Sequence, residues 1–173
     1  MKALSVRQPW AWAILHAGKR IENRSRADGR APDLCRYIGP LLIHAAKGCT
    51  AEEWWSATAW MTMADLAKQR PSSHGIPVVP ELRDLARGGI VGACTVVGYV
   101  GPSGDVYRAN GVRDPHPGED MRWHVKGSFG LVLADVRPLP FMPYKGALGF
   151  FDVPGATPEM VVEVAQREGR CAP

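Results

Sequence analysis

The side chains best suited to chemistry lie close together near the N-terminus, in residues 18–24, which read GKRIENR. Alternation along this stretch predicts a short strand with Glu22 and Arg24 on one face and Lys19 at its entry. A carboxylate between two cations holds their side chains in place, and it can also accept a hydrogen bond from a base amino group. The cations can bind phosphate or a carbonyl oxygen. Two interpretations stay open for this cluster, a ligand-binding site and a surface ion-pair network without a function.

Three further polar residues are expected to lie near this cluster. Arg7 and Gln8 end the first predicted strand, just before a helix that begins at Pro9. Lys145 precedes a glycine, which lets a ligand or another segment approach the backbone, and the lysine could then meet a phosphate. A lysine on a solvated hairpin edge is the alternative for Lys145.

The sequence lacks the motifs of several other classes of site. It has no CxxC pair and no HxxxH spacing, so we expect no metal and no other cofactor. It has no Walker loop and no GxGxxG, which argues against NTP hydrolysis and Rossmann-type dinucleotide binding. No serine or cysteine lies in a nucleophile-elbow motif, which argues against a serine or cysteine hydrolase.

The elements that must position the cluster are short strands with a few helices around them. Strands are expected at residues 2–7, 21–24, 41–45, 90–100, 129–136 and 147–153. Helices are expected at residues 9–17, 50–69 and 80–87, and from residue 157 onward. Because strands and helices do not alternate regularly, five to six strands favour an α+β fold, a small mixed β-barrel with peripheral helices, over a doubly wound sheet.

The length of 173 residues, with 46% apolar side chains, is expected to form a single domain over residues 1–173 with one core. Within it we expect a helical insert at about residues 50–87 and a long loop at about residues 101–126, which is either a functional lid or a surface excursion. Tryptophans at helical spacing, such as Trp10, are interpreted as core; a stacking surface for a base is the alternative.

Charge and cysteine usage bound the partners and the compartment. The formal charge of +4 permits a phosphate-bearing partner without requiring one. The four cysteines form no CxxC pair, which is typical of free thiols in a reducing compartment. No run approaches ~18 apolar residues, and Arg7 interrupts any signal-peptide core, so we expect a cytoplasmic protein with no membrane span.

The sequence resembles the ASCH-domain family, whose fold is PUA-like. The resemblance is carried by Ser-x-Arg-Gln-Pro-Trp at residues 5–10 and by Gly-Lys-x-x-Glu-x-Arg at residues 18–24. Residues 90–94, IVGAC, are similar to the family's central barrel strand, and residues 129–139 and 145–150 resemble the closing strands of bacterial and phage members. The helical insert and the long loop lie outside the resemblance.

The resemblance implies a PUA-like barrel with a cleft that contacts RNA or nucleotides. Lys19, Glu22 and Arg24 fall on the motif positions that line that cleft. We therefore expect a protein that binds RNA, a nucleotide or a modified nucleoside there, with Arg7, Gln8 and Lys145 as neighbours. A third hypothesis is a protein-interaction module that uses the loop at residues 101–126.

The resemblance also implies an enzymatic alternative. Some small family members are metal-independent amidohydrolases that remove the acetyl group from N4-acetylcytidine with a lysine, a threonine three residues later and a distant glutamate. Lys19 matches the lysine, whereas Glu22 stands at the threonine position and no residue is assigned to the distant glutamate. Lys19 would then be the activated amine or electrostatic catalyst and Glu22 the general base. A basic lysine needs a lowered pKa, which burial, Arg20 or Arg24 would provide and Glu22 would oppose.

Overall fold

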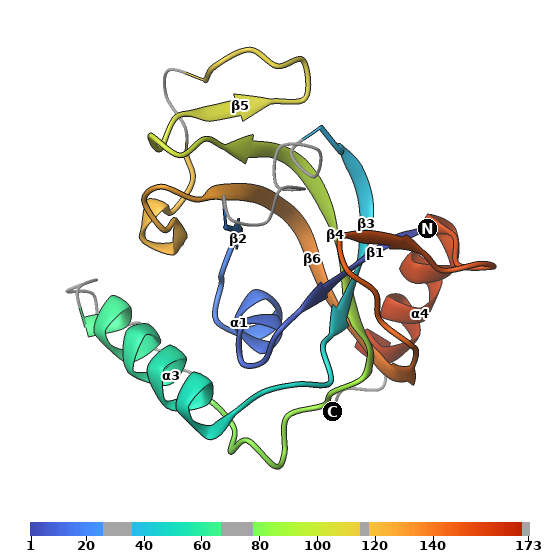
Figure 1. Ribbon diagram of the computed structural model, residues 1–173. Coiled ribbons are helices and arrows are strands. Elements are labelled where there is room, and N and C mark those ends of the chain that lie inside the picture. The colour runs from blue at the N-terminus through green and yellow to red at the C-terminus, as the bar shows by residue number, and fades with distance from the viewer. Residues whose placement is uncertain (26–35, 67–77, 115–117, 171–173) are drawn as a thin grey trace.

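The computed structural model describes residues 1–25, 36–66, 78–114 and 118–170. Within these ranges the chain forms one curled sheet of seven strands with three α-helices and a short 3-10 helix (Figure 1). The strands are β1 (Lys2–Val6), β2 (Ile21–Arg24), β3 (Gly39–Ala45), β4 (Gly89–Val100), β5 (Val106–Arg108), β6 (Phe129–Pro143) and β7 (Phe150–Asp152). The helices are α1 (Trp10–His16), α3 (Ala51–Leu66), η1 (Met121–Trp123) and α4 (Pro158–Arg170). The predicted α+β class with a small barrel-like sheet is confirmed.

The sheet has the strand order β2-β6-β4-β3-β1-β7, and β5 pairs with the far end of β4. Strands β1 and β3 run parallel, and the other pairs are antiparallel. The pairing of β4 with β6 shifts register at three places along β4. Such irregularities bend and twist a strand, and in Figure 1 the sheet curls around α1.

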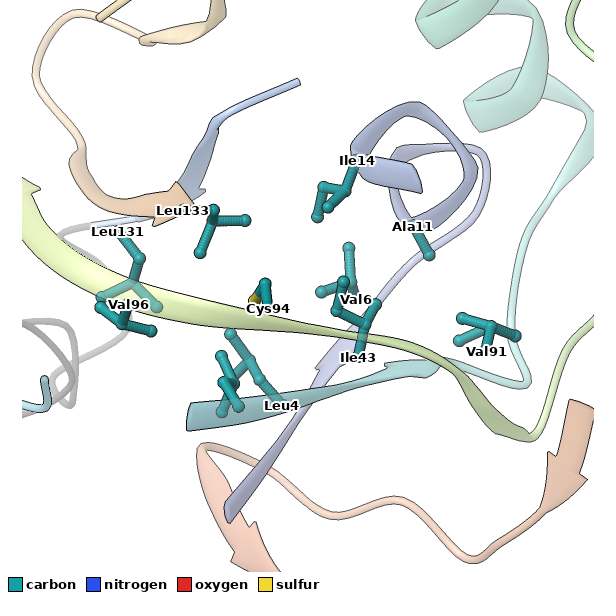
Figure 2. Close-up of a cluster of buried hydrophobic side chains, with 12 residues drawn as sticks. Leu4, Val6, Ala11, Ile14, Ile43, Val91, Cys94, Val96, Leu131 and Leu133 are labelled. Atoms are coloured by element: carbon teal, nitrogen blue, oxygen red, sulfur yellow. The ribbon is translucent and has the colours of Figure 1, made fainter. Parts of the chain in front are cut away.

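The main core fills the concave side of the sheet and lies against α1. Figure 2 shows how Val6 of β1, Ile14 of α1, Ile43 of β3 and Cys94 of β4 point toward one another. Burying a side chain such as Ile14, which is 1% exposed, stabilises the fold by about 1.5–3 kcal/mol. The opposite face packs on α4, where Val161 joins Leu42 and other residues of a smaller cluster.

Helix α3 lies on the open side of the curl (Figure 1). Its buried residues Ala57 and Met61 pack in one cluster with Trp123 of η1. The helix begins with a capping box, in which the Glu53 amide donates to Thr50 Oγ1 at 3.2 Å and the Thr50 amide donates to a Glu53 carboxylate oxygen at 2.9 Å. Its predicted continuation to residue 69 lies outside the described residues.

Two local predictions are wrong. Residues 80–87 form a turn and not a helix, because side chains from other segments bond to their carbonyl groups. The Trp54 indole donates to the Pro80 carbonyl at 2.9 Å, and the Gln8 side-chain Nε2 donates to the Ala86 carbonyl at 2.8 Å. The strand predicted to end at residue 136 continues to Pro143 as β6.

The expected long loop has structure of its own. It contains β5 and η1, and Arg108 forms ion pairs with Asp114 and Glu119 at 2.7 and 2.5 Å. In the part of the chain that the structure describes, no helix is long and apolar enough to cross a membrane.

Candidate functional site

The turn after α1 directs Lys19 into the protein. Gly18 adopts a positive φ of 70°, a conformation that costs glycine little and commonly ends helices. The Lys19 amide then donates to the Ala13 carbonyl at 3.1 Å, which ties the turn to α1. The lysine side chain is buried, with only 2% of the residue exposed.

The structure places Glu22 between the two cations. Lys19 Nζ lies 2.6 Å from Glu22 Oε2 and also donates to the Ile21 carbonyl. The other carboxylate oxygen, Oε1, lies 3.4 Å from Arg24 Nη2. Glu22 is 7% exposed, so this cluster is a buried ion-pair network and not a solvated surface one.

Arg24 connects this network to a strand that is not adjacent to its own. Its Nη2 donates to the Ser5 carbonyl at 3.0 Å, and thereby links β2 to β1 across the opening of the curled sheet. Within the described residues its Nε atom is buried without a hydrogen-bond partner. The contacts of Arg24 with Glu22 and with the Ser5 carbonyl are both made by Nη2.

Burial controls the electrostatics of the lysine. Desolvation lowers the pKa of Lys19 below its ordinary value of 10.5, and nearby Arg24 lowers the pKa further. The charge and hydrogen bond of Glu22 raise the Lys19 pKa, but they offset only part of the desolvation. As expected from the sequence, Glu22 opposes the lowering of the Lys19 pKa, and burial outweighs this opposition.

The Lys19–Glu22 pair faces a pocket of about 450 Å³, which we call the tryptophan pocket. Three indoles line it, from Trp10 of α1, Trp60 of α3 and Trp123 of η1. The rings of Trp10 and Trp60 have centroids 5.7 Å apart, and those of Trp60 and Trp123 lie 5.1 Å apart. Lys19 Nζ lies 6.0 Å from the Trp10 ring centroid, within reach of a cation–π contact. The remaining lining residues are Asn23, Glu53, Ser56, Ala57 and Val125.

Asn23 holds one wall of this pocket in place. Its Nδ2 donates to the Trp123 carbonyl at 2.7 Å, and its Oδ1 accepts from the Val125 amide at 2.9 Å. Both polar atoms of one side chain on β2 thus fix the segment that carries Trp123.

The other residues predicted for the site lie apart from the Lys19–Glu22 pair. Arg7 is exposed and pairs with Glu53, which lines the tryptophan pocket, so Arg7 lies at its edge. Gln8 is buried and structural, because its Nε2 donates to Ala86 and its Oε1 accepts from the Trp12 amide at 3.0 Å. Lys145 lines a different pocket.

Sequence reasoning missed most of the pocket wall. Trp60, Trp123, Asn23 and Glu53 were not selected, and Trp10 was interpreted as core. Trp10 is half-buried, contacts two core clusters and also lines the pocket, so it belongs to both environments. The only sequence signal for this wall is the number of tryptophans in α1 and α3, which does not distinguish a pocket from a core.

The described residues contain no group of three or more His, Cys, Asp or Glu side chains that could hold a metal ion. Cys49 and Cys94 are free thiols, and burial raises the pKa of Cys94 to about 12. Cys35 and Cys171 lie outside the described residues. The tryptophan pocket thus offers one ammonium group, two carboxylates, the Ser56 hydroxyl, the Asn23 carboxamide and flat aromatic surfaces.

Comparison with known families agrees with the motif in β1, α1 and β2. A model of the ASCH domain matches residues 4–116, which include Lys19, Glu22 and Arg24. A search of curated proteins found no match. Strands β6 and β7 follow the matched region and complete the same sheet. Because the match covers more than half of its residues, this chain belongs to the ASCH domain family.

Proposed function

We propose that the protein binds a nucleobase in the tryptophan pocket, as part of RNA, a nucleotide or a modified nucleoside. ASCH domains are generally thought to bind RNA, to act as hydrolases, or both. One observation carries the proposal: three indoles and a buried Lys19–Glu22 pair face the same cavity of about 450 Å³. Stacking of a base on an aromatic side chain contributes about 1–3 kcal/mol and tolerates any base.

The ion pair supplies the selectivity that stacking lacks. Glu22 accepts hydrogen bonds and Lys19 donates them, so together they match a base that carries an amino group beside a ring carbonyl or nitrogen acceptor. Cytosine, adenine and guanine each carry an amino group beside a ring nitrogen acceptor, whereas uracil has no amino group. We therefore expect cytidine, adenosine and guanosine to bind more tightly than uridine.

A second function, hydrolysis of N4-acetylcytidine or a related N4-acylated cytidine, is favoured by the buried position of Lys19 and by a second carboxylate, Glu53, in the same pocket. Glu22 would take a proton from water as the water oxygen bonds to the acyl carbon, and Lys19 would stabilise the resulting oxyanion. The bond from that carbon to N4 then breaks and N4 takes the proton. The products are cytidine and acetate.

Calorimetric titration with the four nucleosides and N4-acetylcytidine tests the binding proposal. Trp60→Ala should weaken nucleoside binding by about 5-fold to 150-fold, because it removes one stacking surface. Trp55→Ala is the matched control, since Trp55 lies in the same helix, is 67% exposed and does not line the pocket. Equal affinities for Trp60→Ala and Trp55→Ala would refute the proposal.

The same samples, kept metal-free and followed by chromatography, test the enzymatic alternative. Release of cytidine from N4-acetylcytidine that is lost in Glu22→Gln, while urea unfolding shows the variant to be folded, would establish hydrolysis in this pocket. Binding of N4-acetylcytidine without release would leave recognition as the function.

A further inference from the structure

A second pocket, of about 660 Å³, is lined by the three exposed cations Lys47, Arg87 and Lys145. We call it the cation pocket. Ser5 and His44 also line it, and it shares no lining residue with the tryptophan pocket.

A chain of backbone hydrogen bonds fixes the three segments that carry the cations. The Gly88 amide donates to the Ala45 carbonyl at 2.8 Å, and the Tyr144 amide donates to the Gly88 carbonyl at 3.1 Å. Each cation lies within two residues of one of these bonded positions. The connection from β3 to α3, the segment before β4 and the connection from β6 to β7 thus meet at one place, as Figure 1 shows near the lower end of the sheet.

A buried histidine, His44, lies against the backbone beside Lys145. His44 is 2% exposed, and its Nε2 lies 3.0 Å from the Tyr144 carbonyl while its Nδ1 lies 3.1 Å from Ser5 Oγ. A Cβ at position 146 would stand 2.5 Å from His44 Cε1 and 2.7 Å from Ser5 Oγ. Only glycine fits at position 146, so the backbone beside Lys145 lies directly on the histidine.

The cation pocket carries uncompensated positive charge. No carboxylate lines it, and within the described ranges none of its three cations takes part in an ion pair or a side-chain hydrogen bond. Three cations elsewhere on the surface differ, because Lys2, Arg83 and Arg113 each pair with a carboxylate at 2.8, 2.9 and 2.6 Å. Three like charges around one cavity attract an anion and are stabilised by it.

We propose that the cation pocket binds backbone phosphates of an RNA strand whose base occupies the tryptophan pocket, an inference that rests on the proposed function. Arg7 lies between the two pockets: its Nε donates to the carbonyl of Gly48, next to Lys47, and its guanidinium pairs with Glu53 of the tryptophan pocket. Because Arg7 and its contacts stand between the two pockets, the proposal assigns the base and the phosphates to different nucleotides of one strand. The expected ligand is therefore a strand and not a mononucleotide.

The test compares binding of an oligocytidylate of about eight nucleotides across a salt series, by fluorescence anisotropy. The cation variant is Lys47→Gln, Arg87→Gln and Lys145→Gln combined. Each lost phosphate contact lowers the slope of log K against log salt by about 0.7, so the slope should fall by about 2 and the affinity by about 100-fold near 0.1 M salt. The folded state should be unaffected, because the three side chains are exposed, and thermal unfolding checks this.

The matched control removes the same charge elsewhere. Lys2→Gln, Arg83→Gln and Arg113→Gln combined replace three surface cations that already pair with carboxylates and that line neither pocket. The control variant should keep most of the wild-type affinity and slope. Equal losses in the cation variant and the control variant would overturn the inference, because only net charge would then matter.

Three further ligands separate the parts of the proposal. Cytidine should bind the cation variant as tightly as it binds the wild type. If the wild type binds the oligonucleotide with the predicted salt slope but does not bind cytidine, the base pocket is refuted and the phosphate site is supported. Cytidine 5′-monophosphate and inorganic phosphate identify the phosphate source. If either competes as strongly as the oligonucleotide, the strand is the wrong ligand and the inference fails.

Discussion

The tryptophan pocket and the cation pocket both contain lysine, but in opposite environments. Lys19 is 2% exposed and has a carboxylate at 2.6 Å, whereas Lys47 and Lys145 are exposed and unpaired within the described chain. A desolvated ion pair is barely screened by salt and points its hydrogen bonds in fixed directions. Exposed cations attract any phosphate and lose that attraction as salt rises. Burial thus makes the tryptophan pocket selective for the shape of a ligand, and exposure makes the cation pocket responsive to its charge.

The two pockets also differ in how they depend on the fold. Side chains from α1, β2, α3 and η1 form the tryptophan pocket, so its polar groups contribute to stability as well as to binding. Backbone hydrogen bonds form the frame of the cation pocket, and its charged side chains extend into solvent. Substitutions should therefore change stability at the first pocket and salt dependence at the second.

The largest contrast should come from Glu22→Gln. This change leaves the Lys19 ammonium group buried without its carboxylate, which should lower the free energy of unfolding by about 3–5 kcal/mol. Asp152→Asn is the control, because it breaks an exposed ion pair with Lys2 at 2.8 Å and should cost about 0–1 kcal/mol. Urea unfolding measures both. Combining Glu22→Gln with Lys19→Met should recover part of the loss; equal costs for Glu22→Gln and Asp152→Asn would contradict the burial argument.

Salt should separate the two pockets in the wild-type protein. Cytidine affinity should stay constant between about 0.05 and 0.2 M salt, because the nucleoside is neutral. Over the same range the affinity for an oligocytidylate should fall about 20-fold if three phosphates are bound. Parallel calorimetric titrations measure both, and a salt-dependent cytidine affinity would remove the distinction between the pockets.

The local part of the site could be predicted from the sequence. Pro9 and Gly18 delimit α1, and alternation in residues 21–24 places Glu22 beside Arg24, as observed. These signals act over a few residues, and the same short segment carries the family motif. The lysine, the glutamate and the arginine were therefore found without knowledge of the fold.

The pocket wall could not be predicted, because it forms only when distant segments pack. Helix α3 has large apolar residues on several sides, so spacing does not identify its buried face. Ala57 and Met61 are buried, while Trp55 and Met63 are each 67% exposed. Trp123 lies in a segment that is fixed by Asn23, through hydrogen bonds that no local pattern reveals.

Asn23 offers a test of how rigid the tryptophan pocket must be. Asn23→Leu removes two hydrogen bonds, at 2.7 and 2.9 Å, that hold the segment from Trp123 to Val125. Stability should fall by about 1–3 kcal/mol and cytidine affinity by about tenfold, since one indole is no longer held in place. Asn110→Leu removes a comparable exposed bond to the Val112 amide and should affect neither pocket. Unchanged cytidine binding by Asn23→Leu would show that Trp123 does not need this support.

Alkaline pH changes the stability of the protein through two buried groups, Cys94 and Lys19. The effect of the Cys94 thiol is measured first, so that the effect of Lys19 can be measured without it. Burial raises the pKa of Cys94 to about 12 from its ordinary 9.0, so above pH 9 the unfolded chain releases a proton that the native state keeps. Stability should fall with rising pH, by about 1 kcal/mol at pH 10, and Cys94→Ala should remove this fall. Urea unfolding from pH 8 to pH 10.5 measures the difference between the two proteins. A parallel pair of profiles would mean that the thiol is not desolvated.

The effect of Lys19 on the pH dependence of stability has the opposite sign. Its pKa is lowered by burial, so between that lowered value and 10.5 the unfolded chain holds a proton that the native state has released. Stability should therefore rise with pH in this window in the Cys94→Ala background, relative to the same protein with Lys19→Met. Glu22 limits the rise, because its charge and hydrogen bond raise the Lys19 pKa. Lys145→Met, at the exposed edge of the cation pocket, should leave the profile unchanged. If Lys19→Met and Lys145→Met give the same profile, the two lysines have similar environments and the contrast between the pockets disappears.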